Sequence, residues 1–307
     1  MEDLLKSFIK KYDFKAEALP VERLAGLEKD FKKNLKKGLI SDKLFKSYLD
    51  GFSFDLPDDL KEAKSIIILG TARPQHRLNI DLDNRTINAI IPPTYIDYRK
   101  IHRDIFKLLK KWLSADGYGV SRALLPLKLT AARSGMAKYG KNNIAYIGEW
   151  GSFHQLAGFY TDWESSKDDP WQEMSVLDAC KTCTLCTRAC PTGAISKDRF
   201  NIDTSRCLTF LNESKDDIPG WVKPESHNSL VGCMRCQHVC PYNKKVKDWI
   251  VDIGRLSQED IRLLDQSSKG MKKDPELVNK LNSMGLYEWL DSVPILRNLR
   301  MLADRYN

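Results

Sequence analysis

The sequence predicts an α+β protein that carries a cysteine-rich module and a helical C-terminal segment. Helical and strand-like apolar patterns alternate up to about residue 165, as in proteins that mix the two element types. All eight cysteines lie between residues 180 and 240, and the apolar pattern after residue 250 is helical. We therefore expect three domains, at residues 1–168, 169–250 and 251–307.

Apolar spacing assigns the elements of the first domain. Residues 1–50 are expected to form amphipathic helices, because apolar side chains recur every three or four positions and Gly38 gives a stop signal. TARPQHR at 71–77 is expected to be a loop or surface turn. The remaining elements are, in order, a strand at 66–69, a strand at 86–91, a helix at 97–114 and a helix–loop–strand unit at 128–153.

Three local signals place helices in the tail. Ser257 and Asp260 form a capping-box pattern before LSQEDIRLLDQ. Asp274 and Pro275 suit the N-cap and first position of a second helix. Pro294 precedes a last helix, ILRNLRMLADR. The C-terminal segment is therefore expected to be helical.

Composition and charge narrow the function classes. No apolar run approaches the roughly 20 residues that span a bilayer, and MEDLLKSFIKKYDF has no signal-peptide core. We expect a cytoplasmic protein with no membrane partner, in which cysteines are reduced and available as metal ligands. The net charge is +8, and KDFKKNLKK at 29–37 is its densest basic stretch. That stretch suits either a nucleic-acid partner or a solvated helix face.

The cysteines form two related motifs. The first is C-x2-C-x2-C-x3-C-P at 180–191, and the second is C-x2-C-x3-C-P at 233–241, preceded by a lone cysteine at 207. In such runs three cysteines hold one iron–sulfur cluster and the fourth ligates the other cluster. Zinc and disulfides fit this spacing less well. We expect two 4Fe–4S clusters, one held by Cys180, Cys183, Cys186 and Cys240 and one by Cys190, Cys207, Cys233 and Cys236.

The order of these motifs resembles the epoxyqueuosine reductase family, cobalamin-dependent iron–sulfur enzymes related to reductive dehalogenases. The similar segments run from AKSIIILG through RSGMAKYGKNNI, GEWGSFHQLAGFYTD and DACKTCTLCTRACPTGAI to VGCMRCQHVCPYN. The resemblance implies a nitroreductase-like domain at 1–168 that holds base-off cobalamin and carries the catalytic site. It also implies a two-cluster, ferredoxin-like domain at 169–250.

The resemblance implies a set of cobalamin-binding residues. They are Arg133, Ser134, Gly135, Gly140, Lys141, Asn142, Asp97, Tyr98, Gly151 and Ser152. Position 99 is arginine, where the family has histidine. The family's proposed proton donor is an aspartate, and its position here is occupied by Ser121. A serine hydroxyl does not replace a carboxylic acid as a proton donor, because its pKa lies far above working pH.

Other side chains are candidates for proton transfer or cofactor contact. Tyr139 and Lys141 are candidate catalytic residues, with Ser121, since a cation beside a phenol lowers its pKa; packing and solvent contact are the alternative roles. His154 could ligate cobalt, although packing or substrate contact is expected instead. His238 lies between cluster cysteines and is expected to form a hydrogen bond near a cluster.

These residues predict an oxidoreductase. We expect it to pass electrons from a low-potential donor, such as ferredoxin or flavodoxin, through two clusters to a corrinoid and on to an unidentified small-molecule substrate. One alternative is epoxyqueuosine reduction on tRNA with a relocated proton donor. Another is electron transfer or corrinoid handling without an organic substrate.

Overall fold

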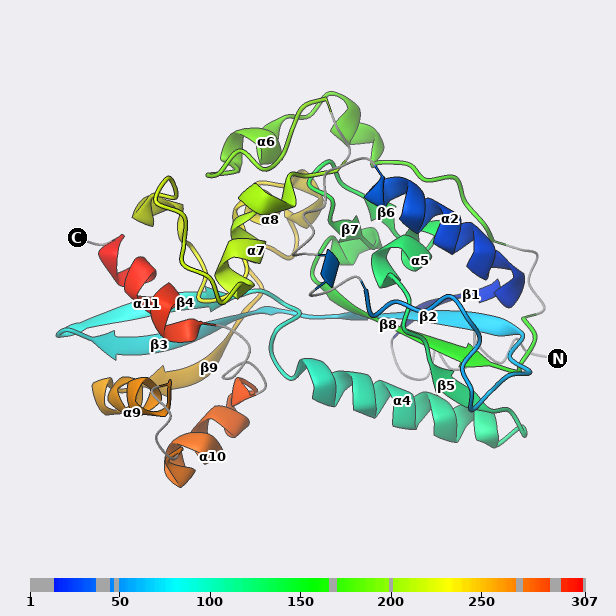
Figure 1. Cartoon of the computed structure of the whole chain (residues 1–307), viewed down its shortest axis with the longest axis horizontal. Coiled ribbons are helices and arrows are strands. Elements are labelled where there is room, and N and C mark those ends of the chain that lie inside the picture. Colours follow the sequence, from blue (N-terminus) through cyan, green and yellow to red (C-terminus); the bar gives the residue numbers. More distant parts are fainter. Residues whose placement is uncertain are drawn as a thin grey trace. The chain divides into compact units, whose positions relative to one another are not determined.

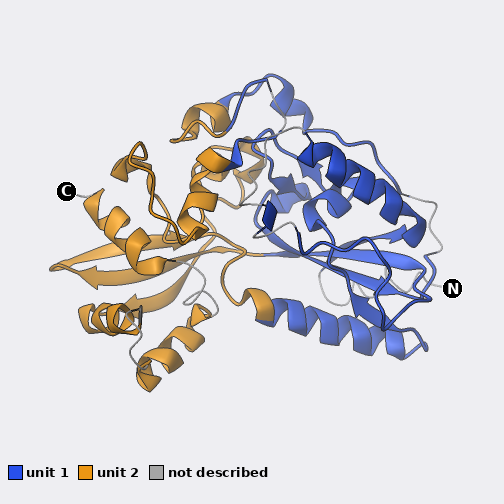
Figure 2. Cartoon of the chain, in the orientation of Figure 1, with its two compact units in different colours: residues 1–72, 100–184, 195–204 blue, residues 73–99, 185–194, 205–307 orange. Residues whose placement is uncertain are grey.

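The computed structural model describes residues 14–36, 45–46, 50–165, 170–198, 201–268, 273–287 and 294–305 (Figure 1). It divides the chain into two compact units (Figure 2). Unit 1 comprises residues 1–72, 100–184 and 195–204, and unit 2 comprises 73–99, 185–194 and 205–307. Helices and strands are mixed in both, which confirms the α+β class. The domain boundaries expected at 168 and 250 stay a prediction, and the two units follow a different division.

Unit 1 is built on a four-stranded antiparallel sheet. Its strand order is β1 (Lys15–Pro20), β2 (Ser65–Ala72), β8 (His154–Thr161) and β5 (Val120–Arg122). β2 and β8 are the central strands, and all eight residues of β8 are buried. Strands that are covered on both faces read as continuous apolar runs, and IIIL at 66–69 of β2 is such a run.

Helices cover both faces of this sheet (Figure 1). On one face, Ile105 and Leu109 of α4 (Tyr98–Ser114) pack against Ile67 and Phe159. On the other face lie α2 (Leu24–Leu35) and α5 (Leu127–Arg133). The predicted helix at 97–114 is confirmed, because its apolar residues recur at helical spacing and form the buried stripe.

The N-terminal expectation is wrong in part. Residues 15–20 form strand β1, which pairs antiparallel with β2, and α2 begins only at Leu24. Polar and apolar residues alternate in KAEA, and Ala16 and Ala18 are buried while Lys15 and Glu17 are only partly buried; this is a strand period. Residues 1–13, 37–44 and 47–49 of the expected helical region lie outside the described residues.

Unit 2 contains a three-stranded sheet in the order β4 (Arg85–Ile91), β3 (Gln75–Leu82) and β9 (Ile250–Leu256). β3 pairs antiparallel with β4 and parallel with β9. Asp83 and Asn84 adopt positive φ at the β3–β4 turn, as two-residue hairpins require. Three helices contribute further residues to its core: α9 (Gln258–Ser268), α10 (Pro275–Ser283) and α11 (Ile295–Asp304).

The tail signals and the loop prediction have different outcomes. The Ser257 backbone N–H donates to Asp260 Oδ2 at 2.6 Å, and Asp274 Oδ1 accepts from the Leu277 N–H at 2.9 Å, so both predicted caps are confirmed. The predicted loop at 71–77 is wrong, because β2 continues to Ala72 and β3 begins at Gln75. β9 is a strand within a tail that was expected to be helical.

The cysteine region is made of short elements. Its helices are α6 (Leu185–Ala189), α7 (Leu208–Glu213) and α8 (Arg235–His238). Two small strands of unit 1, β6 (Lys138–Tyr139) and β7 (Ala145–Tyr146), pair with one another. Short helices separated by turns suit a chain that must direct several cysteines toward a bound group.

Candidate functional site

The segment 133–142, which we call the glycine loop, follows α5 and contains β6. Gly135 has φ +78°, a left-handed conformation that favours glycine after a helix. At Gly140, an added Cβ would lie 2.5 Å from Asn142 Oδ1 and 2.6 Å from Tyr146 Cε2. The sequence places glycine where the backbone turns and where two side chains approach it closely.

The polar side chains of the glycine loop bond within the protein. The Arg133 guanidinium is buried, and it contacts Asp30 Oδ2 at 2.5 Å and donates to the Gln172 carbonyl at 2.6 Å. Asn142 Nδ2 donates to the Tyr146 hydroxyl at 3.0 Å. The Ser134 hydroxyl donates to a carbonyl of α5 at 3.1 Å. These three side chains hold the loop in its conformation.

The glycine loop is bonded to the chain that enters the first cysteine run. The Leu177 N–H donates to the Tyr139 carbonyl at 2.8 Å. Lys141 Nζ donates to the Cys183 carbonyl at 3.0 Å. Both bonds lie within unit 1. The predicted corrinoid loop and the first two cysteines are therefore held against one another.

The candidate proton donors in this loop differ in their surroundings. Burial raises the pKa of the Tyr139 phenol, the opposite of the lowered value that a nearby cation would produce. The hydrogen bond that the structure describes for the Lys141 ammonium group goes to the Cys183 carbonyl and not to the phenol of Tyr139. The arrangement favours a positioning role for Lys141.

Ser121 lies on β5, directly opposite Tyr160 of β8. Its side chain is buried, and its hydroxyl donates to Asp59 Oδ1 at 2.6 Å. Asp59 itself is exposed. Sequence reasoning missed Asp59, because 62 residues separate the two partners. A carboxyl group thus stands beside the position where the resemblance implies an aspartate.

The remaining predicted corrinoid residues lie at two turns. Gly151 has φ +54° in the turn before β8, and Ser152 next to it is buried; both belong to unit 1. Asp97 and Tyr98 belong to unit 2. Asp97 has φ +56°, and its N–H donates to the Gly285 carbonyl at 3.3 Å.

Two histidines have defined partners. Burial lowers the pKa of His154 to about 4, and its Nε2 lies 3.1 Å from the Ala145 carbonyl, as expected of a packed neutral imidazole. His238 Nε2 lies 2.8 Å from Gln75 Oε1 of β3. The hydrogen bond that the structure gives His238 therefore runs to β3, and its expected role beside a cluster stays a prediction.

All eight cysteines are partly buried, and none forms a disulfide bond. In unit 2, the Cys233 thiol interacts electrostatically with Cys207 and Cys190, and burial raises its pKa to about 11. These are three of the four ligands predicted for the second cluster. A bound metal ion deprotonates its thiol ligands, so three thiols that interact with one another fit a cluster. Across the described ranges, no three His, Cys, Asp or Glu side chains are arranged to hold a single metal ion.

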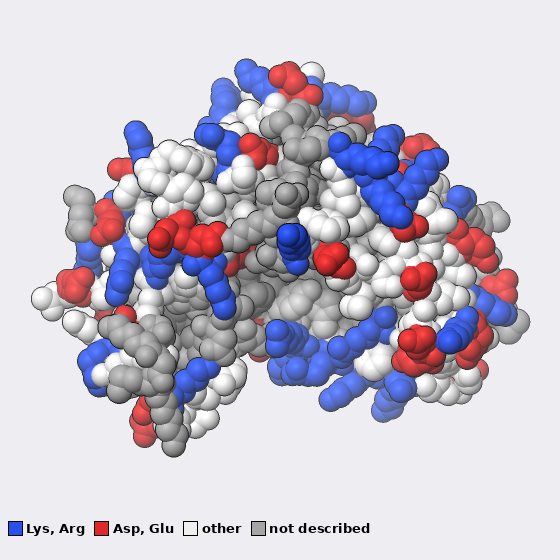
Figure 3. Space-filling model, in the orientation of Figure 1, with Lys and Arg blue, Asp and Glu red and all other residues white. Residues whose placement is uncertain are grey.

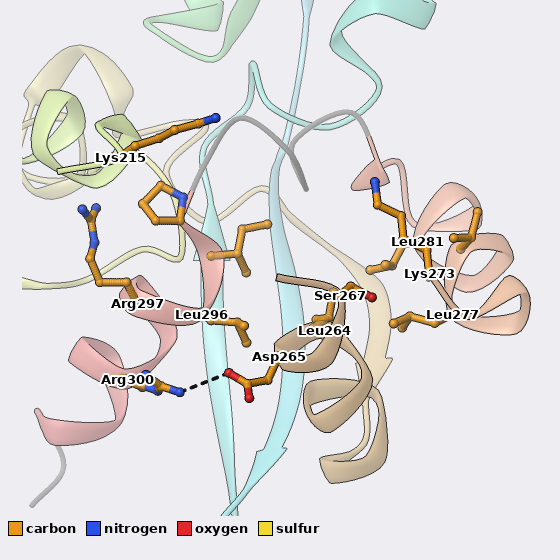
Figure 4. Close-up of a pocket in the computed structure, with 13 residues that line it drawn as sticks. Lys215, Leu264, Asp265, Ser267, Lys273, Leu277, Leu281, Leu296, Arg297 and Arg300 are labelled. Atoms are coloured by element: carbon orange, nitrogen blue, oxygen red, sulfur yellow. Dashed lines mark hydrogen bonds and ion pairs between the residues drawn. The ribbon is translucent and has the colours of Figure 1, made fainter. Parts of the chain in front are cut away.

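A pocket of about 430 Å³ lies in unit 2, lined by residues of α9, α10 and α11 (Figure 4). Arg300 pairs with Asp265 at 3.3 Å, and Arg297 donates to the Ser214 carbonyl at 2.9 Å. None of the predicted catalytic, corrinoid or cluster residues lines this pocket. We therefore place the candidate site at the glycine loop and the cysteines.

A membrane-spanning helix is not found in the part of the chain that the structure describes, where none is both long and apolar enough.

Residues 179–243 match the family described as 4Fe-4S double cluster binding domain. An epoxyqueuosine reductase of Listeria monocytogenes is 34% identical over 270 residues, which cover 80% of this chain and 65% of that protein. The Bacillus subtilis enzyme is 29% identical over 247 residues, with coverages of 75% and 62%. The chain spans about half to two thirds of the length of the curated relatives it matches.

Solved structures show the same fold. An epoxyqueuosine reductase structure from Bacillus subtilis has a TM-score of 0.66 at 22% identity, covering 99% of this chain and 80% of that one. The Streptococcus thermophilus structure has a TM-score of 0.67 at 20% identity, with coverages of 98% and 80%. A third, with a TM-score of 0.64 at 21% identity, holds an epoxyqueuosine-modified tRNA stem loop and covers 99% and 81%.

Proposed function

We propose, from its similarity to epoxyqueuosine reductases and its match to a double-cluster binding domain, that this chain is a cobalamin-dependent iron–sulfur oxidoreductase. It passes electrons from a low-potential donor, such as ferredoxin or flavodoxin, through two 4Fe–4S clusters to base-off cobalamin and on to a substrate. The substrate is an organic molecule other than epoxyqueuosine, because Ser121 stands at the family's acid position.

One observation carries this proposal: the glycine loop and the first cysteine run are bonded together. Lys141 Nζ donates to the Cys183 carbonyl at 3.0 Å, and the Tyr139 carbonyl accepts from Leu177, three residues before Cys180. Electron transfer needs a short, fixed separation between donor and acceptor groups. These contacts give the chain a rigid connection between the two places where such groups would bind.

The proposed site residues have two roles: some would hold the cofactors, and others fix the conformation of the protein around them. The cysteines hold the clusters in the two predicted sets of four. The glycine loop would contact the corrinoid through its backbone, together with Gly151 and Ser152 of the same unit. When bound, the clusters supply one-electron transfer and cobalamin supplies a strongly reducing centre, while the protein provides position and electrostatics. Arg133 and Asn142 keep the loop in one conformation.

The test is anaerobic purification, iron and sulfide analysis, and then spectroscopic titration with cobalamin and a low-potential reductant. We expect about eight irons per chain and a bound corrinoid that can be reduced. Eight irons without affinity for cobalamin would instead indicate a two-cluster electron carrier. Far fewer irons would contradict the proposal.

A pair of lysine variants sharpens this test. Lys141→Met removes the hydrogen bond to the Cys183 carbonyl. We expect this change to weaken cobalamin binding about tenfold or more, because hydrogen bonds of charged groups contribute about 1.5–3 kcal/mol. Lys128→Met is the matched control, because its ammonium group bonds the Asn143 carbonyl at 3.1 Å, away from the cysteines. Equal affinity in both variants would contradict the role given to Lys141.

Epoxyqueuosine reduction on tRNA is the second candidate, favoured by a basic helix face. Lys and Arg side chains gather over α4 (Figure 3), among them the exposed Arg103, Lys107, Lys110 and Lys111. Cations that neutralise phosphates give RNA binding that weakens with salt. Lys107→Glu should weaken tRNA binding and reduce its salt dependence, whereas Lys61→Glu, an exposed lysine near Asp58, should not.

In this second candidate, Asp59 is the relocated proton donor. Its carboxyl group lies 2.6 Å from the Ser121 hydroxyl. Asp59→Asn should then abolish epoxyqueuosine reduction, while the neighbouring Asp58→Asn retains it. Ser121→Asp should give no gain, because two carboxylates this close share one proton. A clear gain in the Ser121→Asp variant would contradict the relocated donor.

A further inference from the structure

Asn228 lies five residues before Cys233, and its side-chain amide reaches the sulfur of that cysteine. Asn228 Nδ2 donates to Cys233 Sγ at 3.2 Å and to the Ser226 carbonyl at 3.0 Å. Both partners belong to unit 2. This is a direct hydrogen bond from a side chain to a predicted cluster ligand.

The orientation of the amide is fixed by its other contacts. Asn228 Oδ1 accepts from the Met234 backbone N–H at 2.9 Å and lies 3.3 Å from the Ser229 hydroxyl. A backbone N–H can only donate, so the oxygen of the amide must face Met234. The nitrogen must then face the sulfur, and the Asn228–Cys233 contact is an N–H···S hydrogen bond.

We propose that Asn228 is a positioning residue that sets the reduction potential of the cluster held by Cys190, Cys207, Cys233 and Cys236. This inference rests on the proposed iron–sulfur function. Reduction adds negative charge to a cluster, and part of that charge resides on the cysteine sulfurs. An N–H donor stabilises the more negative state, so hydrogen bonds to sulfur raise the potential.

A second polar contact lies on the same predicted set of ligands. Cys190 Sγ lies 3.6 Å from the Thr192 hydroxyl, and Cys233 interacts electrostatically with both Cys190 and Cys207. Asn228 therefore acts in a group of mutually close thiols that already receives polar contacts. Substitution of Asn228 would leave the contact between Cys190 and Thr192 in place, so a change in potential can be assigned to Asn228.

The experiment is a spectroscopically monitored redox titration of the full chain with both clusters loaded. Asn228→Leu removes the donor and the acceptor at similar volume. Asn228→Asp removes the donor but keeps an oxygen for the Met234 N–H. Ser229→Ala is the matched control, since its hydroxyl contacts Asn228 Oδ1 rather than the sulfur. Iron is counted in every variant before its potential is measured.

We expect one of the two clusters to become harder to reduce in both Asn228 variants. At a fixed potential, its ratio of reduced to oxidised form should fall about threefold, roughly 28 mV for one electron, while the other cluster and the Ser229→Ala protein stay unchanged. An unshifted Asn228→Asp protein with a full iron count would overturn the inference, even if Asn228→Leu loses iron. Equal shifts of both clusters would also overturn it. Too few irons in the unmodified chain would instead contradict the proposed function itself.

Discussion

Arg133 gives the sharpest test of how the glycine loop is held. The resemblance assigns this residue to the corrinoid, whereas its guanidinium bonds Asp30 and the Gln172 carbonyl and lies 4.8 Å from the ring centroid of Trp171. The side chains of Arg133 and Asp30 are only 8% and 18% exposed. Arg133→Met therefore leaves a largely buried carboxylate without its cation.

The magnitude follows from that burial. Removing one partner of a buried ion pair costs about 3–5 kcal/mol, and the partial exposure of Asp30 favours the lower end. For a chain of this length, a loss of about 3 kcal/mol lowers the melting temperature by about 5 °C. Asp30→Leu combined with Arg133→Met should recover part of the loss, because no unpaired charge then remains.

Thermal unfolding under anaerobic conditions measures this effect. Arg300→Met is the matched control, because Arg300 pairs with Asp265 at 3.3 Å but is 72% exposed; such pairs contribute about 1 kcal/mol or less. If Arg133→Met melts like the control but loses cobalamin affinity, the reasoning is refuted. Arg133 would then be a corrinoid ligand rather than the residue that holds the loop.

Two further predictions concern stability. Burial lowers the pKa of His227 from 6.5 to about 4, so between these values the unfolded chain binds a proton that the native protein does not. Stability should therefore decrease as the pH falls through this window, by about 1.4 kcal/mol per pH unit for this residue. Denaturant unfolding at pH 7, 6 and 5 should show a shallower decrease in His227→Phe, and an unchanged slope would contradict the assignment. At Gly140 a methyl group would lie 2.6 Å from the Tyr146 ring, and such overpacking costs about 1–3 kcal/mol. Gly140→Ala should lower the denaturant concentration at the midpoint of unfolding. Gly220→Ala should not, because Gly220 has open space around it. Equal midpoints would contradict the prediction, because they would show that the loop accommodates the methyl group.

Elements with strong local signals were predictable from the sequence. The helix α4 has apolar residues at helical spacing over its whole length, so its buried stripe can be read directly. The caps at Ser257 and Asp274 depend on partners three residues away. In each case the physical cause lies within one or two turns of chain.

Elements that depend on distant partners were not predictable in this way. β3 begins with Gln75 and His76, two polar residues that are buried, and their burial follows from pairing with β9. Asp30 is 103 residues from Arg133, so no sequence pattern joins them. Asn228 differs, because it lies only five residues from Cys233. An amide so close to a predicted ligand could have been recognised as a candidate from the sequence.

The parallel pairing of β3 with β9 has a consequence for how the protein is made. Arg77 and Asp252, which contact one another across these strands, are 175 residues apart in the chain. At about 5–20 residues per second, a ribosome needs roughly 10–35 s to bridge that distance. During this time β3 has β4 on one side and an unpaired edge on the other, and such an edge favours association with other chains. All eight cysteines are synthesised within this interval. A nascent chain that stalls before residue 250 would therefore expose its thiols while the sheet of β3 and β4 still lacks β9.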